Sequence, residues 1–177
     1  MDAAAIVKKL NVARSGRAWV VSPPDVFEPV VDYLRDTLAL HVDVRRNLPR
    51  DVRELDAPPL DAPPHDTLTA DPAYGYVHVF VTSVAGAAEV LPVAADALAE
   101  DGRLWVSYPK RSSTRYASDL SRDGDGWAPL YALNFEPVSQ VSIDEDWSAL
   151  RFRPVARIAR FTRGFARSEL GKKRLVD

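Results

Sequence analysis

The sequence predicts a three-layer α/β fold with a mostly parallel sheet that ends in an antiparallel hairpin. Short apolar segments rich in β-branched residues alternate with segments whose apolar residues recur at helical spacing, which is typical of β-α-β units. The last two strand-like segments, 137–143 and 147–154, are separated by only three acidic residues, and so short a connection favours antiparallel pairing. Right-handed crossovers place helices on both faces of such a sheet.

Length and composition agree with one α/β domain. The chain has 177 residues, of which 46% are hydrophobic and 27% charged, values that suit one core of ordinary size. It has no cysteine, so disulfides, thiolate metal sites and cysteine nucleophiles are excluded. No apolar run approaches the roughly 20 residues that span a membrane, and the opening MDAAAIVKKL lacks the order of a secretory signal. We therefore expect a soluble, cytoplasmic protein.

The first part of the chain alternates strand and helix. RAWVVS (17–22) predicts a buried strand that ends at two prolines, and LALHVDV (38–44) predicts a second strand. Between them, Asp25 is placed to cap a helix. The apolar face of that helix contains Phe27, Val30, Val31, Leu34 and Leu38.

Residues 48–72 interrupt the alternation. Six of the 14 prolines fall in this segment, which repeats the pattern APPxD. Neither a helix nor a central strand tolerates that density of proline. We expect a long extended loop in place of a further strand–helix unit, and such a loop is typical of a lid, an interface or a disordered segment.

Regular structure resumes with YVHVFVTS (76–83), which predicts a strand. A helix is expected over about 86–100, ending at Asp101-Gly102. RLWVSYP (103–109) predicts the next strand, and a short helix through Trp127 and Leu133 leads to the hairpin. The α/β domain therefore covers residues 1–154.

Residues 155–177 form a separate basic extension or tail. Residues 151–177 contain nine Lys/Arg and two acidic residues, whereas the rest of the chain has 14 Lys/Arg and 23 Asp/Glu. The spacing of Ile158, Phe161 and Phe165 predicts one apolar face of a helix. That face would pack on the domain or on a second subunit. Nucleic-acid binding through the cations and attachment to a membrane surface are the second and third alternatives.

Several motifs resemble those of a small bacterial family of unknown function. They are KKLNV (8–12), PPDVF (23–27), DGRLWVSYPKRSS (101–113), SDL (118–120) and IDEDWSALRFRP (143–154). Family members typically run KKLGIKPG, APEGF, GGxLWVxWPKK, TDL and DExWSALRF. Tyr108 stands where the family has tryptophan, Arg111 replaces a lysine, and SDL replaces TDL. The family resembles the later half of a class I methyltransferase, which implies a degenerate Rossmann-like, methyltransferase-like sheet.

The carboxyl ends of parallel strands meet at one edge of a sheet, where α/β proteins bind ligands. Lys110 and Arg111 lie there beside two hydroxyls, and a helix starting near Ser112 would add free N–H groups, which together suit a phosphate, carboxylate or nucleotide. The alternative is an ordinary strand end with a capped helix and solvated cations. The candidate ligand-binding residues are Ser22, Asp25, Thr82, Ser83, Tyr108, Lys110, Arg111, Ser112 and Ser113.

No cofactor and no metal are predicted. The turn SPPD after the first strand lacks glycine, and its prolines cannot donate N–H groups. Val44 is followed by two arginines where an acid would hold a ribose, so S-adenosylmethionine and dinucleotides are disfavoured. The histidines lack metal-ligand spacing, His78 is expected to be a satisfied core residue, and residues 144–146 are expected to form a charged hairpin turn.

These observations favour a non-catalytic binding or interaction domain with a candidate anion or nucleotide site at 108–113. Two alternatives stay open. One is a transferase or hydrolase acting on a phosphorylated or nucleotide ligand at the same edge, with no catalytic residue identified. The other is a nucleic-acid binder that works through the basic tail.

Overall fold

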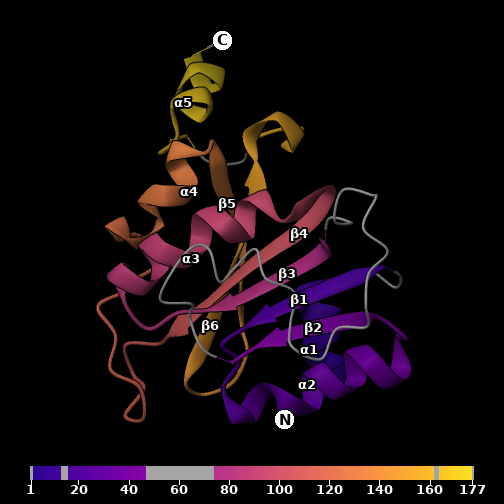
Figure 1. Cartoon of the computed structure of the whole chain (residues 1–177). Helices are drawn as coiled ribbons and strands as arrows, with labels where there is room; N and C mark the ends of the chain where they lie inside the picture. The colour runs from indigo at the N-terminus through magenta and orange to yellow at the C-terminus, as the bar shows by residue number, and fades with distance from the viewer. Residues whose placement is uncertain (1, 13–15, 47–73, 162–163, 177) are drawn as a thin grey trace.

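The computed structural model contains a six-stranded sheet in the order β2-β1-β3-β4-β6-β5 (Figure 1). It describes residues 2–12, 16–46, 74–161 and 164–176. The strands are β1 (Arg17–Val21), β2 (His41–Arg45), β3 (Tyr74–Phe80), β4 (Leu98–Pro109), β5 (Phe135–Ser142) and β6 (Trp147–Pro154). The first four are parallel, and β6 is antiparallel to both β4 and β5. The predicted α/β fold with a C-terminal antiparallel hairpin is confirmed.

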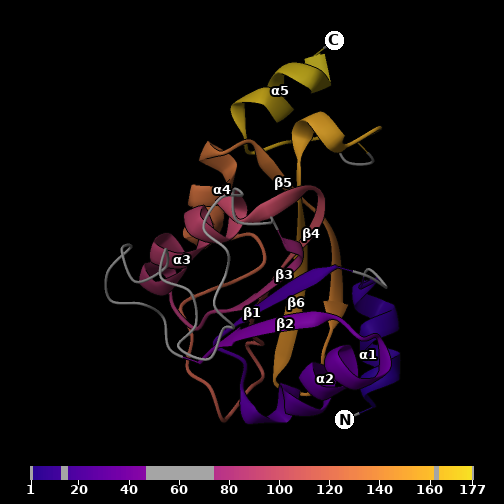
Figure 2. The ribbon, with the colours of Figure 1, turned by 45° about the vertical axis from the view of Figure 1, so that its right-hand side comes forward.

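Helices cover both faces of the sheet (Figures 1 and 2). One face packs against α1 and α2, and the other packs against α3 and α4. The α-helices are α1 (Ala3–Leu10), α2 (Glu28–Asp32), α3 (Val84–Asp96), α4 (Ala128–Ala132) and α5 (Glu169–Val176). Short 3-10 turns are η1 (Asp25–Phe27), η4 (Asp125–Trp127) and η5 (Val155–Arg157), and η2 (Tyr33–Thr37) is a π-helical segment that directly follows α2. The short helix expected between Trp127 and Leu133 is present.

Two apolar cores flank the sheet because side chains alternate along each strand. In β3, Val77 and Val79 face the α3 layer, whereas Tyr76 and Phe80 face the α1 layer. Trp105 of β4 is buried under α1, and its indole N–H donates to the main-chain oxygen of Leu10 at 2.8 Å. The central strands are therefore apolar on both faces, as strands covered by helices on each side must be.

The helix after β3 ends earlier than its sequence pattern predicts. It stops at Asp96, and β4 already begins at Leu98. The reason is pairing with β3: the N–H of Tyr74 donates to the oxygen of Ala97 at 2.9 Å, and Leu98 lies opposite Tyr74. Asp101-Gly102 therefore lies inside a strand irregularity, and the prediction that it ends the helix is wrong.

The described residues do not form the amphipathic helix predicted around Ile158, Phe161 and Phe165. After the short turn η5, residues 158–161 and 164–167 are irregular, and the helix α5 begins only at Glu169. Ile158 is buried, Phe161 is half-buried and Phe165 is 56% exposed, so the three do not form one exposed face.

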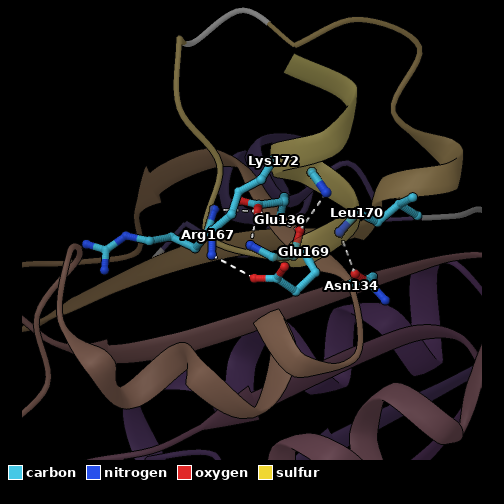
Figure 3. Close-up of polar contacts among 8 residues, drawn as sticks. Asn134, Glu136, Arg167, Glu169, Leu170 and Lys172 are labelled. Atoms are coloured by element: carbon cyan, nitrogen blue, oxygen red, sulfur yellow. Dashed lines mark hydrogen bonds and ion pairs between the residues drawn. The ribbon is translucent and has the colours of Figure 1, made fainter. Parts of the chain in front are cut away.

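A buried carboxylate holds this irregular segment in place. Glu136 of β5 is fully buried, and its Oε1 accepts from the main-chain N–H groups of Arg167 and Ser168, both at 2.7 Å. The N–H of Leu170 donates to Oδ1 of Asn134 at 3.0 Å (Figure 3). These contacts to β5 outweigh the local helical periodicity of the tail.

The predicted proline-rich loop at 48–72 lies outside the described residues. Across the described ranges, no helix is both long and apolar enough to cross a bilayer.

Candidate functional site

The sheet has a topological switch point between β1 and β3. These strands are neighbours, but the chain leaves β1 toward α2 on one face and leaves β3 toward α3 on the other (Figures 1 and 2). In open α/β sheets, ligands bind outside the carboxyl ends of the strands at such a point. Of the predicted site residues, Ser22, Asp25, Thr82 and Ser83 follow these two strand ends.

Ser22, directly after β1, has an unusual backbone and an unpaired side chain. Its φ is 51°, a left-handed conformation that costs a residue other than glycine about 1 kcal/mol or more. Its N–H donates to the main-chain oxygen of Arg45 at 2.5 Å, which joins the ends of β1 and β2. Its Oγ is buried and has no hydrogen-bond partner among the described residues. A strained turn with a free buried hydroxyl is a feature typical of functional sites.

The other predicted residues at these strand ends differ in whether their side chains are available to a ligand. Asp25 is exposed and begins η1, but Pro24 occupies the N-cap position and no side chain caps the turn. The prediction that Asp25 caps a helix is therefore wrong. Ser83 does cap α3, because its Oγ accepts from the N–H of Gly86 at 3.1 Å. Thr82 is exposed. Asp25 and Thr82 are thus available to a ligand.

Tyr108, at the end of β4, points into the core beneath α4. Its side chain is 5% exposed, and its ring centroid lies 5.3 Å from that of Trp127. The phenolic oxygen accepts from Nε2 of Gln140 at 3.2 Å. Burial raises the pKa of this phenol, an effect that the nearby Arg122 partly opposes. The side chain of Tyr108 therefore belongs to the core, and its hydroxyl is already hydrogen-bonded.

Lys110 fastens the strand end to the hairpin. Its Nζ donates to Oγ of Ser142 at 2.8 Å and to the main-chain oxygen of Asp144. The helix expected to begin near Ser112 is absent, because residues 110–124 form turns and irregular chain. Arg111 and Ser112 are exposed. The segment 108–113 therefore lacks the helix N-terminus on which the predicted anion site depended.

The remaining predicted site residue, Ser113, belongs to a turn held by the acidic hairpin connection. Its Oγ donates to Oδ1 of Asp146 at 2.8 Å and accepts from the N–H of Tyr116 at 3.2 Å. Asp144 Oδ1 accepts from the N–H groups of Asp146 and Trp147 at 2.9 and 2.7 Å. The acidic connection therefore forms the expected hairpin turn. Within the described residues, no three metal-binding side chains cluster.

Sequence reasoning missed one polar cluster, which joins the edge strand β2 to the first residues of β1 and β3. Asp43 is 7% exposed, and its Oδ2 accepts from Arg17 at 2.8 Å and from the hydroxyl of Tyr74 at 2.7 Å. The cluster explains how β2 carries an acid inside a buried sheet. The i, i+2 spacing of Asp43 and His41, which lies 3.4 Å from it, was the only available signal.

Comparisons with known proteins find similarity in solved structures. No family model matches the chain and no curated protein matches it, so membership of the small bacterial family stays a prediction. A complex of DhpI with SAH has a TM-score of 0.48 at 12% identity, covering 88% of this chain and 85% of that one. The glycopeptide N-methyltransferase MtfA with sinefungin gives 0.46 at 12%, covering 86% and 85%. A ribosomal protein L11 methylase from Lactobacillus delbrueckii subsp. bulgaricus gives 0.43 at 11%, covering 86% and 76%.

These similarities correct two predictions. A non-catalytic binding or interaction domain was expected, as was the absence of a cofactor with S-adenosylmethionine disfavoured. The similar structures include methyl-transferring enzymes and a complex with SAH, so both predictions are contradicted. The exclusion relied on the missing glycine and the two prolines of the turn SPPD, and on the arginines that follow Val44 in place of an acid. In the structure, Ser22 itself adopts the left-handed conformation for which glycine is usually needed. At 11–12% identity, the likeness to these proteins is one of fold alone.

Proposed function

We propose that the chain binds S-adenosylmethionine at the carboxyl ends of β1 and β3 and transfers its methyl group to an acceptor molecule. The observation that carries this proposal is the turn at Ser22. It combines a φ of 51° with a buried hydroxyl that lacks a partner among the described residues, and it lies at the switch point of the sheet. A ligand that supplies the missing hydrogen bond compensates for burying that hydroxyl.

The side chains at this edge fit the polar groups of the proposed ligand. The exposed carboxylate of Asp25 suits the ammonium of its methionine part, and the hydroxyls of Ser22 and Thr82 suit its hydroxyl and carboxylate groups. Pro23 and Pro24 have no N–H to donate. Binding therefore depends on side chains rather than on a row of main-chain N–H groups. When bound, the cofactor supplies an electrophilic methyl group, and the residues named here hold and orient it.

The first test is isothermal titration calorimetry of the full chain with S-adenosylhomocysteine and S-adenosylmethionine. We expect saturable binding that Ser22→Ala weakens at least tenfold, which corresponds to about 1.4 kcal/mol. Arg35→Ala is the matched control, because Arg35 is exposed on η2. Binding should survive in that variant. The absence of heat from either ligand at millimolar concentration would contradict the proposal.

A second test addresses methyl transfer itself. The full chain is incubated with S-adenosylmethionine and a small-molecule fraction of a cell extract, and S-adenosylhomocysteine is quantified. We expect product formation that requires both the extract and an intact Ser22. Saturable binding without any product in the presence of extract would support a binding role and remove the transferase role.

A further inference from the structure

A hollow lies at the β5 edge of the sheet, away from the switch point between β1 and β3. It is a cleft of about 660 Å³ beside the edge strand β5, and its lining also includes Arg122, Asp123 and residues 158–161, 165 and 167. The strands β3, β4 and β6 separate β1 from β5 in the sheet. The cleft is therefore distinct from the site at Ser22, and its volume falls within the range of about 300–1,000 Å³ that is usual for small-molecule sites.

The cleft is strongly cationic. One acidic side chain, Asp123, lines it. That carboxylate already lies 3.9 Å from Nε of its neighbour Arg122. The cations that line the cleft are Arg122, Arg151, Arg153, Arg160 and Arg167.

Arg151 of β6 shows that this charge is poorly compensated within the chain. Its Nε is buried and has no hydrogen-bond partner in the part of the chain that the structure describes. Burial lowers the pKa of its guanidinium, and repulsion from Arg103 and Arg153 lowers it further. Within the same described ranges, the guanidinium groups of Arg153 and Arg160 form no ion pair or hydrogen bond. An anion in the cleft would compensate these charges and give Nε of Arg151 an acceptor.

The cleft also has aromatic side chains in its lining. Tyr131 of α4 lines it together with Phe161 and Phe165. Phe165 is 56% exposed, although it is one of the largest apolar side chains of this region. The Phe161 ring already accepts a cation–π contact from Arg174, whose guanidinium lies 5.6 Å from the ring centroid. Flat aromatic groups and guanidinium planes are the usual stacking partners of a planar ligand.

We propose that this cleft binds a phosphorylated small molecule with an aromatic group, holding the phosphates on Arg151, Arg153 and Arg160 and the aromatic group against Phe161 and Phe165. Arginine suits phosphate because its planar fork donates two parallel hydrogen bonds. A small molecule fits better than a nucleic acid, since the cations converge on one hollow rather than follow a continuous strip of surface. The site goes beyond the proposed methyl transfer and requires neither S-adenosylmethionine nor Ser22.

Isothermal titration calorimetry with inorganic pyrophosphate and with ATP tests the proposal on the full chain. We expect both to bind, and we expect Arg160→Ala and Arg153→Ala each to weaken both at least tenfold. Arg160 is exposed, so its removal leaves the fold intact, which thermal unfolding verifies. Phe165→Ala should weaken the affinity for ATP severalfold and change the affinity for pyrophosphate by less than twofold, because only ATP carries an aromatic ring.

Control variants distinguish binding in this cleft from binding to other exposed cations and from binding at the site near Ser22. Arg35→Ala removes an exposed arginine of the opposite layer and should leave both affinities unchanged. Arg160→Ala should also leave S-adenosylhomocysteine binding unchanged, so failure of one proposal is distinguishable from failure of the other. The proposal is overturned if neither probe binds, if Arg35→Ala is as damaging as Arg160→Ala, or if a single-stranded oligonucleotide binds more tightly than ATP through the same arginines.

Discussion

His78 of β3 and Ser107 of the neighbouring strand β4 are joined by their side chains, with Nε2 of the imidazole 2.7 Å from the serine Oγ. The other ring nitrogen, Nδ1, lies 2.7 Å from the hydroxyl of Tyr76. All three residues are almost fully buried, and the ring of Phe27 lies edge-on to the imidazole at 4.9 Å. The prediction of a satisfied core histidine is confirmed. A neutral imidazole fits this site, since one nitrogen can donate while the other accepts.

This environment predicts that acid destabilises the protein. Burial lowers the pKa of His78 from 6.5 to about 3. Between these values the unfolded chain binds a proton that the folded chain does not, so stability is fully present above about pH 6.5 and falls as the pH drops toward about 3. The slope contributed by this group approaches about 1.4 kcal/mol per pH unit. Urea unfolding at pH 7.0, 5.5 and 4.5 measures it.

The matched variant is His78→Gln, which keeps hydrogen-bonding groups but cannot titrate. It will be less stable at every pH, so the comparison concerns slopes rather than absolute free energies. We expect a shallower loss of stability between pH 7.0 and 4.5 than in the wild type. Equal slopes in the two proteins would show that His78 is not the group responsible.

Removing the side chains of the neighbours Lys110 and Arg111 should have very different effects on the stability of the protein. Lys110→Ala removes charged hydrogen bonds to Ser142 and to the main-chain oxygen of Asp144, and we expect a loss of about 1.5–3 kcal/mol in the free energy of unfolding. Arg111→Ala removes an exposed side chain and should change stability by less than about 0.5 kcal/mol. Chemical denaturation of both variants measures the difference. Equal effects would contradict the structural role assigned to Lys110.

Glu136→Ala should release the C-terminal segment. The substitution removes the acceptor of two main-chain N–H groups and of the Ser168 hydroxyl, and we expect a loss of about 3 kcal/mol. At this chain length that lowers the melting temperature by roughly 6–12 °C. Hydrogen exchange at the amides of Arg167 and Ser168 should accelerate. Glu169→Gln, on an exposed acid of α5, is the control and should leave both measurements unchanged.

Ser22 should show a trade-off between stability and ligand affinity. Ser22→Ala removes a buried hydroxyl without a partner among the described residues, so the free protein should be as stable as the wild type or more so. Ser22→Gly additionally relieves the left-handed backbone at φ 51° and should stabilise it by roughly 1 kcal/mol. Thermal unfolding without and with S-adenosylhomocysteine separates the two effects. Ser22→Ala that loses stability without the ligand would indicate a structural role for the hydroxyl.

Much of the sheet could be predicted from the sequence because its signals are local. The segment 77–81 is apolar except for His78, and the connection between β5 and β6 is short enough to require a hairpin. The end of α3 could not be predicted, since the competing contact is the pairing of Tyr74 with Leu98. The prediction of a helix in the tail was wrong for the same reason. Its helical spacing is a local pattern, whereas Glu136 binds the tail from 31 and 32 residues away.

The candidate site was predictable in position and not in detail. Strand ends place Ser22 and Thr82 at one edge of the sheet, which follows from the order of elements alone. The partners of Lys110, by contrast, lie 32 and 34 residues further along the chain, and no pattern near Lys110 indicates them. The arginine-rich cleft draws its lining from α4, β5, β6 and the tail, so only the folded chain brings those charges together.

The bonds of Glu136 also impose an order on biosynthesis. A ribosome makes the chain from its N-terminus, and the N–H groups that solvate this carboxylate follow it by 31 and 32 residues. Before these N–H groups have been made, β5 can join the sheet in two ways. Either the Glu136 carboxylate stays in water, or it is buried without these hydrogen bonds, which is strongly unfavourable. The burial of Glu136 with these bonds is therefore possible only after the chain has been made as far as Ser168.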